Sequence, residues 1–116
     1  MTTNVIYSAG SISLSAGTYI ITVNAGVSIV GGTTLVGQMT AGYSTSSTAF
    51  SQNINLAINY SGVTANVGNQ WVLTSSNIIS VASTTTYNLL IQCSFGTAGR
   101  LQYNQSLSAF RAVRIA

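Results

Sequence analysis

The sequence contains no aspartate, no glutamate and no histidine. General acid–base catalysis depends on side chains that titrate near neutral pH, and these are usually of those three types. Metal sites in proteins use carboxylate, imidazole or thiolate ligands, and the chain offers one thiol, Cys93. A serine or cysteine nucleophile would have no base to activate it. The composition therefore predicts a protein that is not an enzyme and that has no catalytic residues, metal site or cofactor.

Charged residues are also scarce, at 3% of the chain, and the net charge of +3 comes from arginines in its last part. A nucleic-acid-binding protein carries a dense stripe of Lys and Arg, so we expect no nucleic-acid partner. Ser, Thr, Asn and Gly interrupt each apolar stretch before it is long enough to cross a bilayer as a helix, so we expect no membrane insertion. The first residues show no basic region followed by an apolar run, and we expect no signal peptide.

What the chain has in abundance is the chemistry of β-strands. Hydrophobic residues make up 47% of the sequence, proline is absent, and β-branched residues alternate with Ser, Thr and Asn. Short alternating runs separated by turn residues predict an all-β sandwich or barrel, and the length fits a single domain over residues 1–116. The predicted strands cover residues 5–7, 11–15, 18–30, 33–41, 53–60, 70–74, 77–82, 85–95, 100–103 and 107–115.

Several of these strands are apolar on both faces. The strand 18–30 places Tyr19 and Ile21 on one face but Ile20 on the other, and Leu90 interrupts the polar face of strand 85–95. A monomer would expose the second apolar face, and the chain has few charges to protect its sheet edges. We therefore expect an oligomer, the alternative being a monomer made soluble by Ser, Thr and Asn alone. The candidate interface residues are Tyr19, Ile20, Ile21, Leu90, Phe110, Val113, Arg114 and Ile115.

Two single residues lead to specific hypotheses. Cys93 shares its strand face with Leu89 and Ile91, which predicts a buried thiol that behaves as a small hydrophobic side chain. Arg114 has no acidic side chain to pair with, and one hypothesis pairs it with the Ala116 carboxylate of a neighbouring subunit. The alternative is that, of Arg111 and Arg114, one is solvated and the other lies at a strand end.

Two polar segments are candidate binding loops, because loops on a rigid scaffold often carry recognition. One follows the strand 33–41, and the other combines amide side chains with a tryptophan, a set suited to binding glycans. The alternative for Trp71 is that it belongs to the core, as large aromatic residues usually do. The candidate binding residues are Tyr43, Ser44, Thr45, Ser46, Asn66, Asn69, Gln70 and Trp71.

Three segments carry a resemblance to a known family. The segment 12–21, with Leu14, Gly17 and Tyr19, is similar to the apolar-x-Leu-x-x-Gly-x-Tyr-apolar pattern of trimeric jelly rolls of the tumour-necrosis-factor and complement globular-head type. The segment 79–91 resembles the strand, turn and strand of that family. The ending 108–116, with Phe110, resembles its last strand and also the tips of viral and phage fibre or spike proteins. The chain departs from the complement type at residues 83–85, where Gly-Asp is missing, and it lacks acidic calcium ligands.

The resemblance implies an antiparallel two-sheet jelly-roll sandwich that forms a homotrimer. It also implies that the strands beginning at Thr18, Thr85 and Leu107 form the sheet that packs about the threefold axis. The leading functional hypothesis is a virion surface attachment module, the head of a fibre or spike, which binds a host-surface glycan or protein. One alternative is a capsid decoration or cementing protein. Another is a secreted cytokine-like or lectin-like module, whose location would be extracellular rather than the virion surface.

Overall fold

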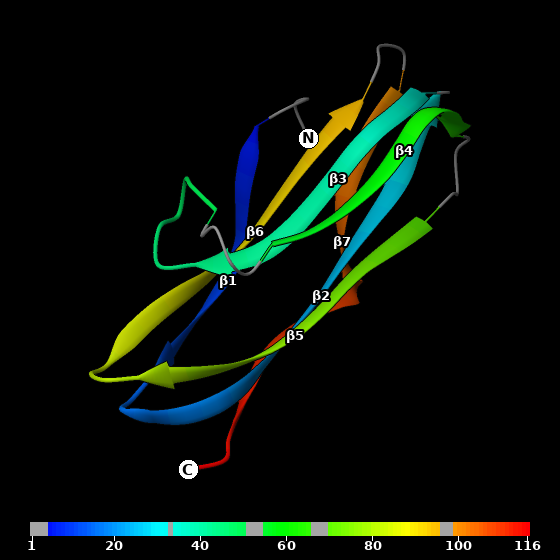
Figure 1. Ribbon diagram of the computed structural model, residues 1–116. Helices are drawn as coiled ribbons and strands as arrows, with labels where there is room; N and C mark the ends of the chain where they lie inside the picture. The colour runs from blue at the N-terminus through cyan, green and yellow to red at the C-terminus, as the bar shows by residue number, and fades with distance from the viewer. Residues whose placement is uncertain (1–4, 33, 51–54, 66–69, 96–98) are drawn as a thin grey trace.

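The computed structural model describes residues 5–32, 34–50, 55–65, 70–95 and 99–116, and these residues form seven β-strands (Figure 1). No helix occurs within the described ranges, which confirms the all-β prediction. β-branched and aromatic residues fit the pleated surface of a strand, and they recur along each segment. The strands are β1 (Ile6–Leu14), β2 (Gly17–Gly32), β3 (Thr34–Ser44), β4 (Asn55–Ala65), β5 (Gln70–Val81), β6 (Thr85–Phe95) and β7 (Gly99–Arg114).

The strands form two antiparallel sheets that pack face to face (Figure 1). The four-stranded sheet has the order β1-β6-β3-β4, and the three-stranded sheet has the order β5-β2-β7. Along one side of the sandwich β1 lies near β7, and along the other side β4 lies near β5. The two sheets therefore enclose a core between them and leave one solvent-facing surface on each.

The sheet assignment corrects one expectation. The strands that begin at Thr18 and contain Leu107 are neighbours, as β2 and β7, but the strand that begins at Thr85 is β6 in the other sheet. β6 is hydrogen-bonded to β1 and β3. Alternation identifies the buried face of a strand, but strands of both sheets turn such a face towards the same core. It therefore could not assign β6 to a sheet.

Several strands are longer than their apolar runs suggest. β5 runs unbroken through Ser75 and Ser76, and β7 continues through Gln105 and Ser106, where two short strands were expected in each case. β1 also joins two expected pieces, with a register shift between Ser8 and Gly10. Polar residues interrupt the hydrophobic pattern at these points, which is why the pattern predicts two strands. A strand with one face in water accommodates such residues without ending.

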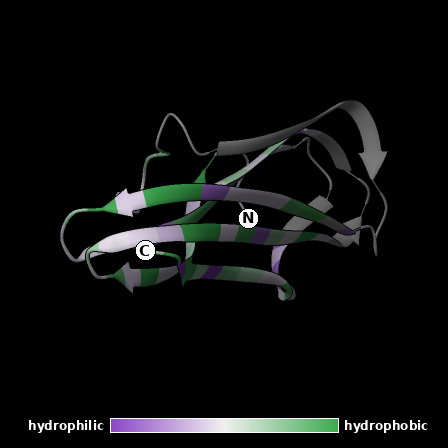
Figure 2. Ribbon diagram, turned by 60° about the horizontal axis from the view of Figure 1, so that its bottom comes forward, coloured by the Kyte–Doolittle hydropathy of each residue, from purple (hydrophilic) through white to green (hydrophobic). Residues whose placement is uncertain are grey.

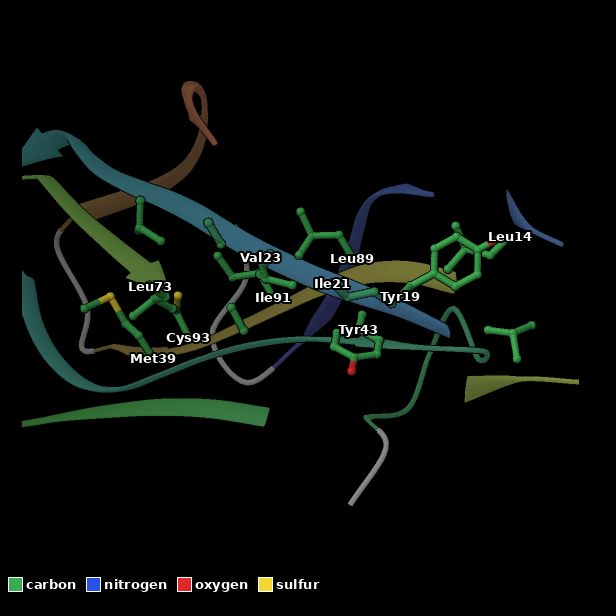
Figure 3. Close-up of a cluster of buried hydrophobic side chains, with 14 residues drawn as sticks. Leu14, Tyr19, Ile21, Val23, Met39, Tyr43, Leu73, Leu89, Ile91 and Cys93 are labelled. Carbon is green, nitrogen blue, oxygen red and sulfur yellow. The ribbon is translucent and has the colours of Figure 1, made fainter. Parts of the chain in front are cut away.

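The core is built from alternate residues of strands in both sheets. Along β2 every second side chain from Tyr19 to Val27 is buried, which is the period-2 alternation of a half-buried strand. Figure 2 shows the same alternation as bands of opposite hydropathy along the strands. The other sheet contributes Met39, Tyr43, Leu89 and Ile91, which approach the β2 side chains in Figure 3. Burying each such side chain contributes about 1.5–3 kcal/mol to folding.

A bulge in β7 sets which of its residues face the core. Ala109 lies opposite Asn24 and Asn104 lies opposite Gly26, so β7 has extra residues between these two positions. The hydroxyl of Ser108 closes the bulge, since it donates to the Asn104 carbonyl at 2.6 Å and accepts from the Gly26 amide at 2.8 Å. The side chains after the bulge alternate between the two faces as in a regular strand. Because of the extra residues, however, their pairing with β2 is shifted relative to the residues before the bulge.

The bulge matters because it brings two aromatic residues of β7 to the same face. An unbroken strand would point Tyr103 and Phe110 to opposite faces, since Phe110 follows Tyr103 by seven positions, an odd step in a period of two. Both nevertheless pack against the core. Gly26 is required opposite the bulge, because a Cβ atom there would lie 2.6 Å from the Leu107 Cβ. The position of Tyr103 thus depends on a local irregularity of the sheet.

Candidate functional site

The solvent-facing side of the three-stranded sheet carries a row of apolar side chains. In the hydrogen-bonded register, Ile20 of β2 lies opposite Ile78 of β5 on one side and Val113 of β7 on the other. Ile78 is 68% exposed and Val113 is 58% exposed. Ile115 is also exposed and follows directly, where its amide donates to the Thr18 carbonyl at 2.8 Å. We call these four residues, Ile20, Ile78, Val113 and Ile115, the apolar row.

Short hydroxylated side chains border the apolar row. The next register row along the sheet consists of Ser76, Thr22 and Arg111, and Ser80 pairs with Thr18 on the other side. Arg111 is the one charged side chain that the described residues place among these rows. The described residues of this face are therefore weakly polar and include one charged side chain, so little like-charge repulsion opposes contact with a second surface.

The structure separates six of the predicted interface residues into two groups. Ile20, Val113 and Ile115 lie on the solvent-facing side of the sheet, as expected. Tyr19, Ile21 and Phe110 instead face the core, where Ile21 is fully buried. The two apolar faces of β2 and β7 had been identified from the sequence, but the residues of both faces were included in one interface. That assignment is corrected for these three residues, because side chains between the two sheets are already covered within one chain.

Leu90 is placed differently from the other predicted interface residues. It lies on β6, in the four-stranded sheet, and pairs with Ser8 and Gly42. Its alternation puts it on the side away from Leu89 and Ile91, yet it is fully buried within the single chain. Leu90 therefore does not belong to the apolar row, and its prediction as an exposed interface residue is corrected.

Ile78 completes the row, although sequence reasoning missed it. The signal was present, because the adjacent Ile78 and Ile79 make β5 apolar on both faces, just as Ile20 and Ile21 do for β2. The polar neighbours Ser76 and Ser80 share the face of Ile78. The hydrophobic pattern predicts two short strands, 70–74 and 77–82, in place of β5, and Ile78 is not among the predicted interface residues.

Arg114 finds a partner within its own chain. Its Nε donates to the main-chain oxygen of Ala116 at 3.1 Å, and the Thr18 amide donates to the same oxygen at 3.0 Å. Gly17, at φ +155°, lies close beneath, where a Cβ atom would come 2.8 Å from the Arg114 Nε. The contact between Arg114 and Ala116 is therefore one of several hydrogen bonds that connect the residues after β7 to the start of β2.

The first predicted binding loop begins later than expected. Tyr43 and Ser44 are the last residues of β3 and are both buried. The Tyr43 ring packs edge-on against Tyr87, with centroids 5.7 Å apart, and against Phe110 at 6.3 Å. Tyr43 and Ser44 are thus corrected to core positions, because the strand continues past the small residues that precede them.

Burial raises the pKa of Tyr43, and the nearby Asn77 side chain opposes part of that rise. The Tyr43 hydroxyl makes no hydrogen bond of good geometry among the described residues. A buried phenol in this position stays protonated at neutral pH and faces no solvent. It is therefore placed to pack the core rather than to bind a ligand.

The other predicted binding residues do not come together into one site. Thr45 and Ser46 are in the loop, where the Ser46 hydroxyl accepts hydrogen bonds from the amides of Thr48 and Ala49, both at 3.1 Å. Gln70 is the exposed first residue of β5, whereas Thr45 and Ser46 follow the end of β3. Asn66 and Asn69 lie outside the described residues, as does the side chain of Trp71.

Cys93 is buried, as predicted. Its position in the core raises the pKa of the thiol to about 12, because burial penalises the charged thiolate. Reactive cysteines require a substantial thiolate population at neutral pH. Cys93 is therefore an inert core residue.

A hollow opens between the two sheets along the side where β1 lies near β7. Its volume is about 260 Å³. The residues that line it are Tyr7, Ser8, Ala9, Ile91, Gln102 and Tyr103. Ser8 and Gln102 are exposed at its rim, and Ile91 is fully buried at its floor. Sequence reasoning did not identify this site, because its walls come from opposite ends of the chain.

Comparison with protein-family models and with curated proteins finds no match for this chain. Within the described residues, no three potential metal-ligating side chains cluster together. The same residues include no helix long and apolar enough to span a membrane. The apolar row and the hollow are thus the two features on which a function can be argued.

Proposed function

We propose that the chain is a non-catalytic jelly-roll module of a virion surface, which forms a homotrimer and attaches the particle to a host-surface glycan or protein. The observation that carries the assembly is the apolar row. Ile78, Ile20 and Val113 extend across all three strands of the sheet, and in the single chain Ile78 and Val113 are exposed while Ile20 between them is half-buried. Apolar surface of this kind becomes more stable when a second surface covers it.

The strand order supports a jelly roll. Three antiparallel pairs are nested along the sequence, β3 with β4, β2 with β5 and β1 with β6. Successive pairs alternate between the two sheets. This arrangement results when a long antiparallel double strand winds around a core, which is how a jelly roll is built. In this scheme β7 follows the outermost pair and lies against β2.

The number of subunits and the location on a virion rest on the resemblance of segments 12–21 and 108–116 to trimeric jelly rolls and to fibre or spike tips. The structure adds a physical reason for a symmetric oligomer. The apolar row is continuous with the end of β7, and like-charge repulsion is low because the flanking rows carry Ser, Thr and a single Arg111. Such a face can pack against copies of itself around a symmetry axis.

The absence of a chemical step follows from the residues present. The sequence has no acid–base side chain of the usual types, and its one thiol is buried with a raised pKa. The recognition that we propose for this chain uses hydroxyl and amide hydrogen bonds together with aromatic contacts. These are the interactions that suit a glycan or a neutral protein surface.

Light scattering after size-exclusion chromatography tests the assembly. We expect a mass of about three times the 12.0 kDa of one chain. A 12.0 kDa monomer at every concentration up to the millimolar range would refute the oligomer and the function that depends on it.

Attachment is tested separately with fluorescently labelled protein on host cells and on purified virions that lack this chain. We expect the protein to bind cells and to lose that binding when surface glycans or proteins are removed by enzymes. Binding to the virions without any binding to cells would refute attachment, and it would favour the decoration or cementing role instead.

A further inference from the structure

The hollow between β1 and β7 combines two kinds of surface in one small volume. Its walls carry the tyrosines Tyr7 and Tyr103, and Ile91 lies at its floor. Its rim carries the hydroxyl of Ser8 and the amide of Gln102. Tyrosine itself has an apolar ring and a polar tip, and binding pockets typically pair such surfaces with a few placed polar groups.

The volume limits the size of the ligand. At about 260 Å³ the hollow lies just below the range of drug-sized pockets, so it fits a ligand of one ring rather than several. A sugar ring is matched to this surface, because one of its faces is lined with C–H groups while hydroxyls surround its edge. The C–H face can rest on the aromatic wall, and the hydroxyls can reach Ser8 and Gln102.

The charge of the residues that line the hollow determines whether it favours a neutral or an acidic sugar. None of the described residues that line the hollow is an arginine, a lysine or an acid, and their polar groups are neutral hydroxyls and an amide. An acidic sugar would lose hydration on entering without gaining a cationic partner, which costs binding free energy. The chemistry therefore favours a neutral sugar over one that carries a carboxylate or a sulfate.

The hollow stays open in the proposed oligomer. Tyr103 lies opposite Val27 of β2, whereas Val113 lies opposite Ile20. These positions on β2 are separated by roughly 23 Å, at about 3.3 Å per residue. The hollow also opens between the sheets and not on the surface that carries the apolar row. Covering the row does not therefore cover the hollow.

We propose that this hollow is a binding site for a neutral monosaccharide unit, held by Tyr7, Tyr103, Ser8 and Gln102. The proposal rests on the proposed attachment function and names a glycan as the host-surface ligand. It places recognition at the side of the sandwich and not in the loops that the sequence suggested.

Saturation-transfer difference NMR with the full chain tests the site. The probes are methyl glycosides of glucose, galactose, mannose, N-acetylglucosamine and N-acetylgalactosamine, with sialic acid as the charged comparison. We expect at least one neutral glycoside to bind with a dissociation constant on the order of 1 mM, as suits a single ring. Its ring C–H protons should receive the strongest signal. No binding by any neutral probe, or equal binding by sialic acid, overturns the proposal.

Two variants locate the binding site. Gln102→Ala should weaken the best probe by roughly three- to tenfold, the effect of losing one hydrogen bond. The matched control is Gln38→Ala, which removes an exposed amide from the outer surface of the other sheet, where Gln38 donates to Thr40 at 3.3 Å. Equal weakening by both variants, or no weakening by Gln102→Ala, refutes the site.

Tyr103→Phe provides a variant that keeps the packing of the ring. It should retain most of the ring C–H signal but lose affinity if the hydroxyl contacts the sugar. Light scattering of each variant separates this proposal from the oligomer. A protein that still forms the oligomer but binds no sugar refutes the hollow alone. An extended peptide that shifts the NMR signals of Tyr103 in place of any sugar would show that the free edge of β7 binds a strand, and it would likewise overturn the sugar proposal.

Discussion

Replacing Ile78 with threonine tests the proposed oligomer at the most exposed member of the apolar row. Threonine is also β-branched and suits a strand, so the change mainly substitutes a hydroxyl for apolar surface. Ile78 is 68% exposed in the single chain and makes little contribution to its core. Each subunit of the variant should therefore fold as the unmodified subunit does, and the variant should differ only in how strongly its subunits associate.

The size of the effect follows from the surface that association would cover. Isoleucine and threonine differ by about two buried methylene equivalents, or about 1.6 kcal/mol when the side chain passes fully out of water. Scaling by the exposed fraction of 68% leaves about 1 kcal/mol for each subunit. Three subunits lose about 3 kcal/mol per trimer, which raises the overall dissociation constant by about two orders of magnitude.

Sedimentation equilibrium over a range of concentrations measures this shift, and urea unfolding of the monomer checks the fold. Val5→Thr is the matched control, because Val5 is an exposed β-branched residue that precedes β1 in the other sheet. We expect the control to associate as the unmodified chain does. If Ile78→Thr leaves the dissociation constant unchanged, or if Val5→Thr raises it equally, the apolar row is not the interface.

Three further predictions concern stability. Gly26→Ala should lower the free energy of unfolding by roughly 1–3 kcal/mol, because the added Cβ would lie 2.6 Å from the Leu107 Cβ and 2.9 Å from the Asn104 carbonyl oxygen. Urea unfolding measures this free energy, and an unchanged midpoint would contradict the packing described for the bulge. Above pH 9.0 the unfolded chain loses the Cys93 proton that the folded protein keeps up to pH about 12, so stability should fall by about 1.4 kcal/mol per pH unit in this window. Cys93→Ala should make that decline shallower, and an identical slope in the variant would count against the raised pKa. Because no Asp, Glu or His is present, the free energy of unfolding should change by less than about 1 kcal/mol between about pH 7 and about pH 4; cooperative acid unfolding in circular dichroism would contradict this.

The pattern of residues predicted part of the candidate interface. The adjacent Ile20 and Ile21 showed that one strand is apolar on both faces, and alternation was sufficient to divide the two faces. It was not sufficient to say which face is the core, because that depends on the side from which the other sheet packs. Tyr19 and Ile21 were therefore grouped with Ile20, although the structure places them on opposite sides of β2.

The hollow lay beyond sequence reasoning for a related reason. Tyr7 and Tyr103 are near opposite ends of the chain, and their proximity arises because β1 and β7 border the same side of the sandwich. The inward position of Tyr103 also depends on the bulge held by Asn104 and Ser108. No local period predicts a bulge, since the extra residues change the register with the neighbouring strand.

By itself the sequence determined the all-β class, the burial of Cys93 and the absence of acid–base side chains of the usual types. These follow from composition and from a period of two, both of which are local. The tertiary structure decided which strands share a sheet, which face of each is buried, and where two distant tyrosines meet. Those properties depend on hydrogen bonds between segments far apart in the chain, and local alternation carries no information about such partners.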